Sequence, residues 1–311
     1  MLTTLKEVLG AADQGGYAVG AFNVNNLEIL RAVIDTAVEK KSPVIIQTSE
    51  GAIEYAGMEY LVALVKVAAQ APVPVVFHVD HGKNLDLIHR AIESGYSSVM
   101  FDGSVLPHDE NVAKTKQVVA WARAKGVSVE AEIGAIKGVE DLVSVSEKEA
   151  FFTNPEEAAK FAEETGCDAL AISIGTAHGA FKSKIAPELD IERLAKIDAL
   201  VNAPLVLHGA SGIIPDVVEL TKYKCEILGD CDRLSGAVGI PDDQITAAIK
   251  HGIRKINIDS DLRLAFTAGL RQTVLDDHKN IDPRKWLAPS IKLMSQVVSR
   301  KMELFGCAGE A

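Results

Sequence analysis

The sequence has little cysteine and few aromatic residues. Its 311 residues include only four cysteines, Cys167, Cys225, Cys231 and Cys307, and no two of them form a C-x-x-C pair. This spacing indicates neither a zinc ribbon nor a disulfide scaffold. We therefore expect free thiols in a reducing, cytoplasmic compartment.

Long apolar stretches and runs of basic residues are also missing. No stretch reaches about 18 uninterrupted apolar residues, so no membrane span is expected. The N-terminal segment, MLTTLKEVLGAADQGG, has acidic and polar residues within its apolar pattern, unlike a signal peptide. The net charge is −11, and basic residues are neither clustered nor interleaved with aromatic ones. A nucleic-acid-binding surface is therefore not expected.

The composition that remains is that of a globular protein, with 48% hydrophobic and 24% charged residues. Short β-rich runs, nearly continuous in hydrophobicity, alternate with longer segments of helical period. Such runs are typical of strands covered on both faces. The predicted strands are Ala18–Val24, Pro43–Thr48, Pro74–Asp80, Ser98–Asp102, Ser128–Gly134, Ala169–Gly175, Pro204–Gly209 and Lys255–Ser260.

Helices are predicted between these strands. Asn154 and Pro155, for example, form a typical helix start, with a capping side chain followed by proline in the first turn. Eight strands interleaved with helices predict a closed (β/α)8 barrel of α/β class, because parallel strands need crossover connections. An open doubly wound sheet is the alternative, but no G-x-G-x-x-G follows the first strand.

We predict one barrel domain over residues 1–311 with two additions to the bare repeat. Residues 213–244, between the last two strands, are longer than one helix needs and are read as an insertion. Residues 276–311 form a C-terminal extension ending in an amphipathic helix, Ser290–Leu304, which packs on the barrel or on a neighbouring subunit.

Polar side chains gather where the predicted strands end. In a parallel barrel this C-terminal end carries the active site. Burying charged groups there is costly unless they are paired or bind a metal. The residues concerned are Asp80, His81, Asp102, Glu130, Glu132, His178, His208, Asn257 and Asp259.

Three histidines, His81, His178 and His208, follow different strands and favour a zinc site with an open fourth position. Taken singly, each is better explained as a hydrogen-bonded core or rim histidine, and only the three together at predicted strand ends favour metal binding. His78 shares a strand face with Asp80 and is expected to be structural.

Two further segments favour a phosphate site and a mobile acid. The turn Gly209-Ala210-Ser211-Gly212 and the segment Asn257–Ser260 occupy the usual phosphate region of such barrels, where backbone N–H groups can approach an anion. Neither motif is specific alone, since such a turn is more often an ordinary loop, but their joint position favours phosphate. The polar loop 134–147 carries Glu140 and Asp141 between glycines. Such a loop can bring a carboxylate over a substrate for proton abstraction, although a solvated surface loop would have the same composition.

Motifs along nearly the whole chain resemble the class II, metal-dependent ketose-bisphosphate aldolases, most closely the bacterial fructose-1,6-bisphosphate enzymes. The resemblance implies a glycolytic and gluconeogenic lyase that releases dihydroxyacetone phosphate and glyceraldehyde 3-phosphate. The matching segments are Gly20–Val24, Ser49–Ala52, Phe77–Gly82, Val129–Gly134, Gly175–Gly179, Leu207–Gly212, Lys255–Arg263 and Asp282–Lys285.

The resemblance also implies residue roles and a cofactor set. His81, His178 and His208 would bind Zn²⁺, and Asp102 and Glu132 a second or displaced divalent ion. Asp80 would be the acid, Glu140 the mobile base, and Asn257 would hold the enediolate. The substrate would contact Ser49, Gly179, Gly209, Ala210, Ser211, Asp259, Ser260 and Arg263, with a monovalent cation, Na⁺ or K⁺, nearby. Arg284 would bind the distal phosphate across the interface of a homodimer or homotetramer.

Several alternatives remain open at this point. Tagatose-1,6-bisphosphate aldolases look similar, though they generally lack the longer insertion. A lysine Schiff base is not favoured, because Lys255 stands at the start of its predicted strand. A zinc hydrolase of the same fold class is one rival, and a non-catalytic sugar-phosphate-binding protein that keeps the pocket is another. The phosphate turns argue against the hydrolase, and both Asp80 and Glu140 argue against the binding protein.

Overall fold

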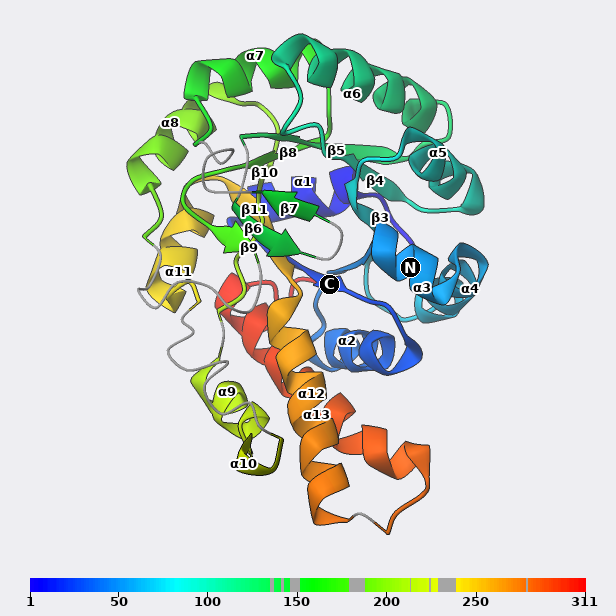
Figure 1. Cartoon of the computed structure of the whole chain (residues 1–311). Helices are drawn as coiled ribbons and strands as arrows, with labels where there is room; N and C mark the ends of the chain where they lie inside the picture. The colour runs from blue at the N-terminus through cyan, green and yellow to red at the C-terminus, as the bar shows by residue number, and fades with distance from the viewer. Residues whose placement is uncertain are drawn as a thin grey trace.

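A closed parallel barrel forms the centre of the computed structural model (Figure 1). The structure describes residues 1–134, 137–140, 143–145, 152–178, 188–212, 214–223, 225–228, 239–277 and 279–311. The barrel strands are β1 (Val19–Asn23), β2 (Val44–Ser49), β3 (Val75–Gly82), β4 (Ser98–Phe101), β5 (Ser128–Ile133), β8 (Ala169–Ile172), β10 (Leu205–Leu207) and β11 (Ile253–Ile258). Their order, β1-β11-β10-β8-β5-β4-β3-β2, confirms the predicted (β/α)8 barrel.

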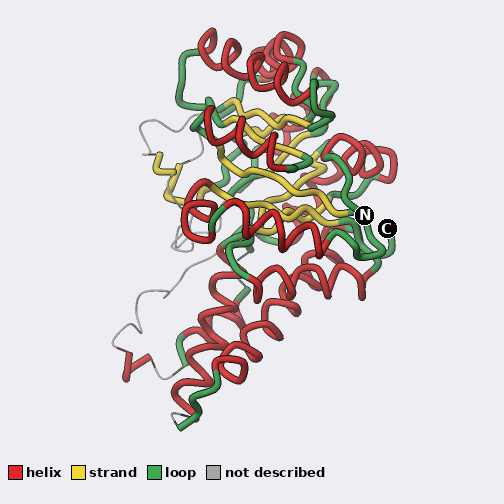
Figure 2. Tube along the Cα trace, turned by 90° about the vertical axis from the view of Figure 1, so that its right-hand side faces the viewer, coloured by secondary structure: helices red, strands yellow, loops and turns green. Residues whose placement is uncertain are grey.

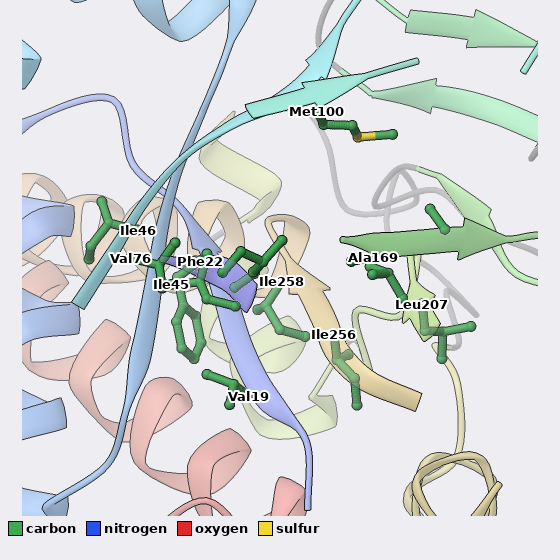
Figure 3. Packing of buried hydrophobic residues seen from close by; sticks show 14 of the residues in the cluster. Val19, Phe22, Ile45, Ile46, Val76, Met100, Ala169, Leu207, Ile256 and Ile258 are labelled. Atoms are coloured by element: carbon green, nitrogen blue, oxygen red, sulfur yellow. The ribbon is translucent and has the colours of Figure 1, made fainter. Parts of the chain in front are cut away.

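The seam of the barrel joins its first and last strands. Val19 of β1 is in register with Lys255 of β11, and Phe22 with Ile258. Figure 3 shows apolar side chains from neighbouring strands meeting in this region, including Phe22 and Ile45. Fully burying one such side chain is worth roughly 1.5–3 kcal/mol. Apolar burial on both faces of the sheet therefore stabilises the closed form.

Helices cover the outside of the barrel, as the period of the sequence predicts. They are α2 (Leu27–Lys40), α3 (Glu50–Ala56), α4 (Met58–Ala68), α5 (Leu85–Ser94), α6 (His108–Arg123), α7 (Pro155–Thr165), α8 (Ile191–Leu200) and α11 (Asp242–Lys250). The predicted helix start at Asn154 is confirmed, since its side chain accepts the Glu157 N–H at 3.0 Å. Among the helices of the described residues, none combines the length and apolar character that crossing a bilayer requires.

The N-terminal helix, α1 (Leu5–Gly15), lies at the end of the barrel where the strands begin. The backbone N–H of Lys6 donates to Oγ of Ser128, the first residue of β5, at 3.1 Å. The two chain termini lie close together at this same end (Figure 2). The opposite end, where the strands finish, is therefore left for the polar residues that follow them.

Part of the predicted loop 134–147 forms short strands. β6 (Lys137–Glu140) and β7 (Val143–Val145) pair antiparallel, and β9 (Ala177–His178) pairs parallel with β6. Expecting only a loop there was wrong, because valines in both short runs favour extended backbone. This small sheet lies over the barrel end opposite the termini (Figures 1 and 2).

The C-terminal part forms an arm beside the barrel. α12 (Ser260–Asp276) packs against α13 (Pro283–Phe305), and both project beyond the barrel (Figures 1 and 2). The predicted final helix started at Ser290, but α13 begins earlier, because Asp282 caps it and proline is tolerated in its first turn. The two helices approach closely at Gly269, where a Cβ would collide with the backbone of Ser290.

The insertion contains α9 (Pro215–Thr221) and α10 (Cys225–Leu228), which agrees with the added helix expected there. Cys167 and Cys307 are free and buried, and burial raises the pKa of Cys167 to about 11. Cys225 is disulfide-bonded, so the expectation of a free thiol at this position was wrong. The lack of a C-x-x-C pair excludes only one spacing along the chain, whereas a disulfide depends on the distance between two cysteines in the folded protein. Cys231 lies outside the described residues.

Candidate active site

Buried acids and imidazoles from different strands converge where the barrel strands end. Asp80 and His81 belong to the end of β3, Asp102 follows β4, Glu132 lies on β5 and His208 follows β10. Each of these five residues is at most 5% exposed. Their ligand atoms form two overlapping groups that could hold a metal ion, Asp80–His81–His208 and His81–Asp102–Glu132, each within 4.8 Å.

His81 is common to both groups and has unusual backbone geometry. Its φ of 48° lies in the left-handed region, which is rare outside glycine and is often found at functional sites. Its Nδ1 lies 3.1 Å from Oδ2 of Asp102, and its ring meets that of His208 edge-on at 4.5 Å between centroids. This backbone turn brings the imidazole beside its neighbours from β4 and β10.

The charge around His81 favours a bound cation. Burial alone would lower the pKa of His81, but the carboxylates of Asp80, Glu132 and Asp102 raise it well above its ordinary value. A divalent ion can take the place of such a proton. Imidazole nitrogens with carboxylate oxygens are ligands that zinc accepts, so the residues present fit a divalent metal.

His208 is held between two glutamates of β5. Its Nε2 lies 2.8 Å from Oε1 of Glu130, and its Nδ1 lies 3.4 Å from Oε2 of Glu132. Both carboxylates and the imidazole are buried. The ring is therefore fixed with one edge toward the group that could hold a metal and the other toward the barrel interior.

Two of the three predicted zinc ligands, His81 and His208, are brought together. The backbone of His178 lies in β9, in register with Gly138 of β6. Its side chain lies outside what the structure describes, as does the side chain of Glu140. Gly179 and Asp141 fall outside the described residues altogether. Their roles stay predictions.

Asp80 is surrounded by side-chain amides, two of which sequence reasoning missed. Its Oδ2 accepts hydrogen bonds from Nδ2 of Asn23 at 2.9 Å and Nε2 of Gln47 at 3.1 Å. Its Oδ1 accepts one from Nδ2 of Asn257 at 3.0 Å. Polar side chains within otherwise apolar strands were the only signal for Asn23 and Gln47. These three amides hold the Asp80 carboxylate in one orientation beside His81.

The expected phosphate region is formed by small residues and helix starts. Gly209, Ala210 and Ser211 are buried after β10, and Ser260 is the first residue of α12. The exposed N–H groups of a helix start favour anions. A pocket of about 220 Å³ lies beside this region, lined by Asn23, Asn25, Ser49, Gly51, Tyr55, Asp259 and Arg263.

Arg263 and Ser49 are positioned by contacts within the chain. Nε of Arg263 lies 2.8 Å from Oδ1 of Asp259, and Oγ of Ser49 accepts the N–H of Ala52 at the start of α3. Both residues line the 220 Å³ pocket. Their assignment to substrate binding stays a prediction.

Arg284 lies in the first turn of α13, one of the two helices that project beyond the barrel (Figure 1). Its side chain is 89% exposed and pairs with Asp282 at 2.9 Å. Within one chain it is not part of the buried cluster.

A deeper polar layer lies beneath the cluster. Nζ of Lys255 is 2.8 Å from Oε2 of Glu130, and Nε2 of His78 is 3.4 Å from the same oxygen. Burial would raise the pKa of Glu130, but the charge of Lys255 and the contacts of His208 and His78 hold it below its ordinary value. Because Lys255 is paired with Glu130, it is not available as a free amine nucleophile. This agrees with the sequence argument against a Schiff base.

Comparisons with known proteins point in one direction. The family model described as fructose-bisphosphate aldolase class-II matches residues 3–310. A fructose-bisphosphate aldolase of Thermus caldophilus is 48% identical over 311 residues, covering 100% of both chains. One of Helicobacter pylori strain J99 is 43% identical over 312 residues, again covering 100% of both. The crystal structure of the YdjI aldolase from Escherichia coli K12 matches with a TM-score of 0.80 at 33% identity, covering 100% of each chain.

Proposed function

Because the chain belongs to the class II fructose-bisphosphate aldolase family, we propose that it reversibly cleaves fructose 1,6-bisphosphate to dihydroxyacetone phosphate and glyceraldehyde 3-phosphate. The observation that carries this proposal is the buried group Asp80, His81 and His208 at the end of the barrel where the strands finish. The family model matches residues 3–310, a range that includes every residue of the proposed site.

We propose one catalytic Zn²⁺, held by His81, His178 and His208. Asp102 and Glu132 share a second candidate group with His81, which supports a second or displaced divalent ion there. We also propose a monovalent cation, Na⁺ or K⁺, near the phosphate turns, and only the family resemblance supports it. A bound divalent ion would act as a Lewis acid on the C2 carbonyl of the substrate.

The chain's own residues supply the proton transfers. In cleavage, Asp80 takes the proton of the C4 hydroxyl as the C3–C4 bond breaks and glyceraldehyde 3-phosphate leaves. The bonding electrons pass toward the C2 oxygen, and Asn257 holds the resulting enediolate. Glu140 then returns a proton to C3. In synthesis the same groups act in reverse, with Glu140 as base and Asp80 as acid.

Binding of the two phosphates is divided between two regions. One phosphate lies against the turn Gly209-Ala210-Ser211 and the segment Asp259–Ser260, with Gly179, Ser49 and Arg263 also contacting the substrate. The other needs a cation that these turns do not provide, and Arg284 of a neighbouring subunit supplies it. This assignment requires a homodimer or homotetramer. That oligomeric state and a cytoplasmic location stay predictions.

The alternatives are weaker. The names of the relatives favour fructose over tagatose bisphosphate. Asp80 exchanges a proton with the C4 oxygen in the aldol reaction. A hydrolase would not need an acid held for that purpose beside the proposed metal ligands. A non-catalytic binding protein would need neither Asp80 nor Glu140.

A coupled assay for triose phosphate release tests the proposal. The protein is assayed with fructose 1,6-bisphosphate and with tagatose 1,6-bisphosphate, before and after chelation, and again after Zn²⁺ is restored. We expect fructose bisphosphate cleavage that disappears on chelation and returns with Zn²⁺. Full activity in a metal-free preparation would overturn the metal assignment, and preference for the tagatose substrate would overturn the substrate assignment.

A further inference from the structure

The deeper polar layer is not used by the proposed chemistry, yet it contacts one of the proposed metal ligands. His78 of β3, Glu130 of β5 and Lys255 of β11 are each 0% exposed. The interior of such a barrel is usually filled by branched aliphatic side chains. A buried lysine, glutamate and histidine there require a specific reason, because burying charge is costly.

The two oxygens of Glu130 have different partners. Oε2 faces Lys255 Nζ at 2.8 Å, whereas Oε1 faces Nε2 of His208 at 2.8 Å. The other nitrogen of His208, Nδ1, lies on the side of Glu132, 3.4 Å from its Oε2. His208 also belongs to the group with Asp80 and His81 that could hold an ion. The imidazole thus links the deeper layer to the cluster.

We propose that Glu130 and Lys255 are positioning residues for metal binding, with Glu130 accepting the Nε2–H of His208 and Lys255 fixing Glu130 in that position. The inference rests on the proposed function, since it takes His208 as a metal ligand. Histidine ligands commonly donate their second N–H to a carboxylate, which fixes the tautomer and the ring orientation. With Nε2 protonated, the lone pair of Nδ1 faces the cluster.

Lys255 has two effects in this arrangement. It provides the counter-charge that a fully buried carboxylate needs. By holding Oε2, it also keeps Oε1 directed at His208. Nε2 of His78 lies 3.4 Å from the same oxygen, and its Nδ1 is in turn 2.8 Å from Oγ of Ser98. The orientation of one proposed ligand is therefore determined by contacts from β3, β5 and β11.

A purely structural ion pair would explain the burial equally well, so the test must separate stability from metal binding. The variant Glu130→Leu/Lys255→Met removes both charges and the acceptor while leaving no unpaired buried charge, which favours folding. The variant Glu130→Gln/Lys255→Met removes the charges but keeps a carbonyl oxygen that can accept the N–H of His208. Lys301→Met/Asp261→Asn is the matched control, because it removes both charges of another buried ion pair, 3.1 Å apart, and keeps an oxygen that can accept the N–H of Gly212.

Three measurements are made on each full-length protein. Thermal melting of the metal-free form, followed by circular dichroism, reports folding. Competition with a chromophoric chelator gives the Zn²⁺ dissociation constant. The visible absorption spectrum of the Co²⁺-loaded form reports the geometry of the ligands.

We expect Glu130→Leu/Lys255→Met to bind Zn²⁺ about 10- to 100-fold more weakly and to change the Co²⁺ spectrum. Glu130→Gln/Lys255→Met should recover part of that affinity, and Lys301→Met/Asp261→Asn should alter melting alone. Wild-type affinity in the Leu/Met variant, or no recovery in the Gln/Met variant, would overturn the proposal. If the wild-type protein binds neither Zn²⁺ nor Co²⁺, the proposed function fails as well.

Discussion

The two ends of the barrel use charged side chains in opposite ways. Where the strands finish, Asp80, His81 and Glu132 are buried and crowded together. Where the strands begin, charged residues form separate pairs at the surface: Lys6 with Asp168 at 3.3 Å, and Arg254 with Asp13 at 2.8 Å. In each of these pairs one partner is more than half exposed.

The volume of the pockets does not identify the reactive end of the barrel, whereas the burial of charged groups does. A pocket of about 730 Å³ lies where the strands begin, lined in part by Lys6, Asp13 and Asp168. The pocket beside Arg263, at the other end, measures about 220 Å³. Exposed ion pairs contribute little free energy, whereas buried acids must be held by hydrogen bonds or a metal. Convergence of buried titratable groups therefore identifies the reactive end better than volume.

The sharpest test of this contrast is removal of a proposed metal ligand. His208→Ala should lose bound Zn²⁺ and lower cleavage by at least about 10²–10³-fold, because stabilisation of developing charge in the substrate is lost. His81→Ala and His178→Ala should behave alike. Metal content is measured by atomic emission together with turnover. A variant that keeps its zinc and its turnover would remove that histidine from the ligand set.

The next largest effect is expected at the amide-held acid. Asp80→Ala should keep its metal and still exchange the C3 proton of dihydroxyacetone phosphate, but lose about 10²–10⁴-fold in carbon–carbon bond cleavage. Detritiation of labelled dihydroxyacetone phosphate is compared with cleavage. Loss of both in equal measure would assign Asp80 a different role.

Replacing Glu140, the proposed base, should give the reverse pattern. Glu140→Ala is expected to slow C3 proton exchange by about 10²-fold while zinc content and melting temperature stay unchanged. The matched variant is Asp141→Ala, the neighbouring acid. Exchange that is impaired only in the second variant would move the base to Asp141.

A smaller loss is expected far from the cluster. Arg284→Ala should lower kcat/KM for fructose 1,6-bisphosphate about ten- to a hundredfold, because a charge-assisted phosphate contact is worth roughly 1.5–3 kcal/mol. Fructose 1-phosphate, which lacks the distal phosphate, should be cleaved almost as before. Equal losses on both substrates would show that Arg284 does not contact that phosphate.

The smallest effect is expected at the other end of the barrel. Lys6→Ala removes one partner of an exposed pair, and Asp168 keeps a hydrogen bond from the N–H of Val129 at 2.9 Å. The free energy of unfolding should fall by no more than about 1 kcal/mol, with turnover unchanged. Urea unfolding and the coupled assay check both. A large loss of turnover would contradict the contrast between the ends.

The sequence predicts this barrel well because each strand is an apolar run bounded by turn signals. His81 and His208 could be found because they follow such runs directly. The roles of Asn23 and Gln47 could not, since contact with Asp80 depends on how the sheet curves and closes. Lys255 was assessed only as a nucleophile, because nothing local indicates that its side chain points at Glu130. Likewise, the disulfide of Cys225 depends on distances that spacing along the chain does not give.

The seam between β1 and β11 has a consequence for folding. Asp80 is held by Asn23 from the first strand and by Asn257 from the last, which lies 177 residues beyond Asp80 in the sequence. Contacts between such distant segments form slowly, because a long loop must first be closed. While the chain is still emerging from the ribosome, Asp80 therefore lacks its contact with Asn257. Recovery of aldolase activity during refolding would time the docking of the last strand.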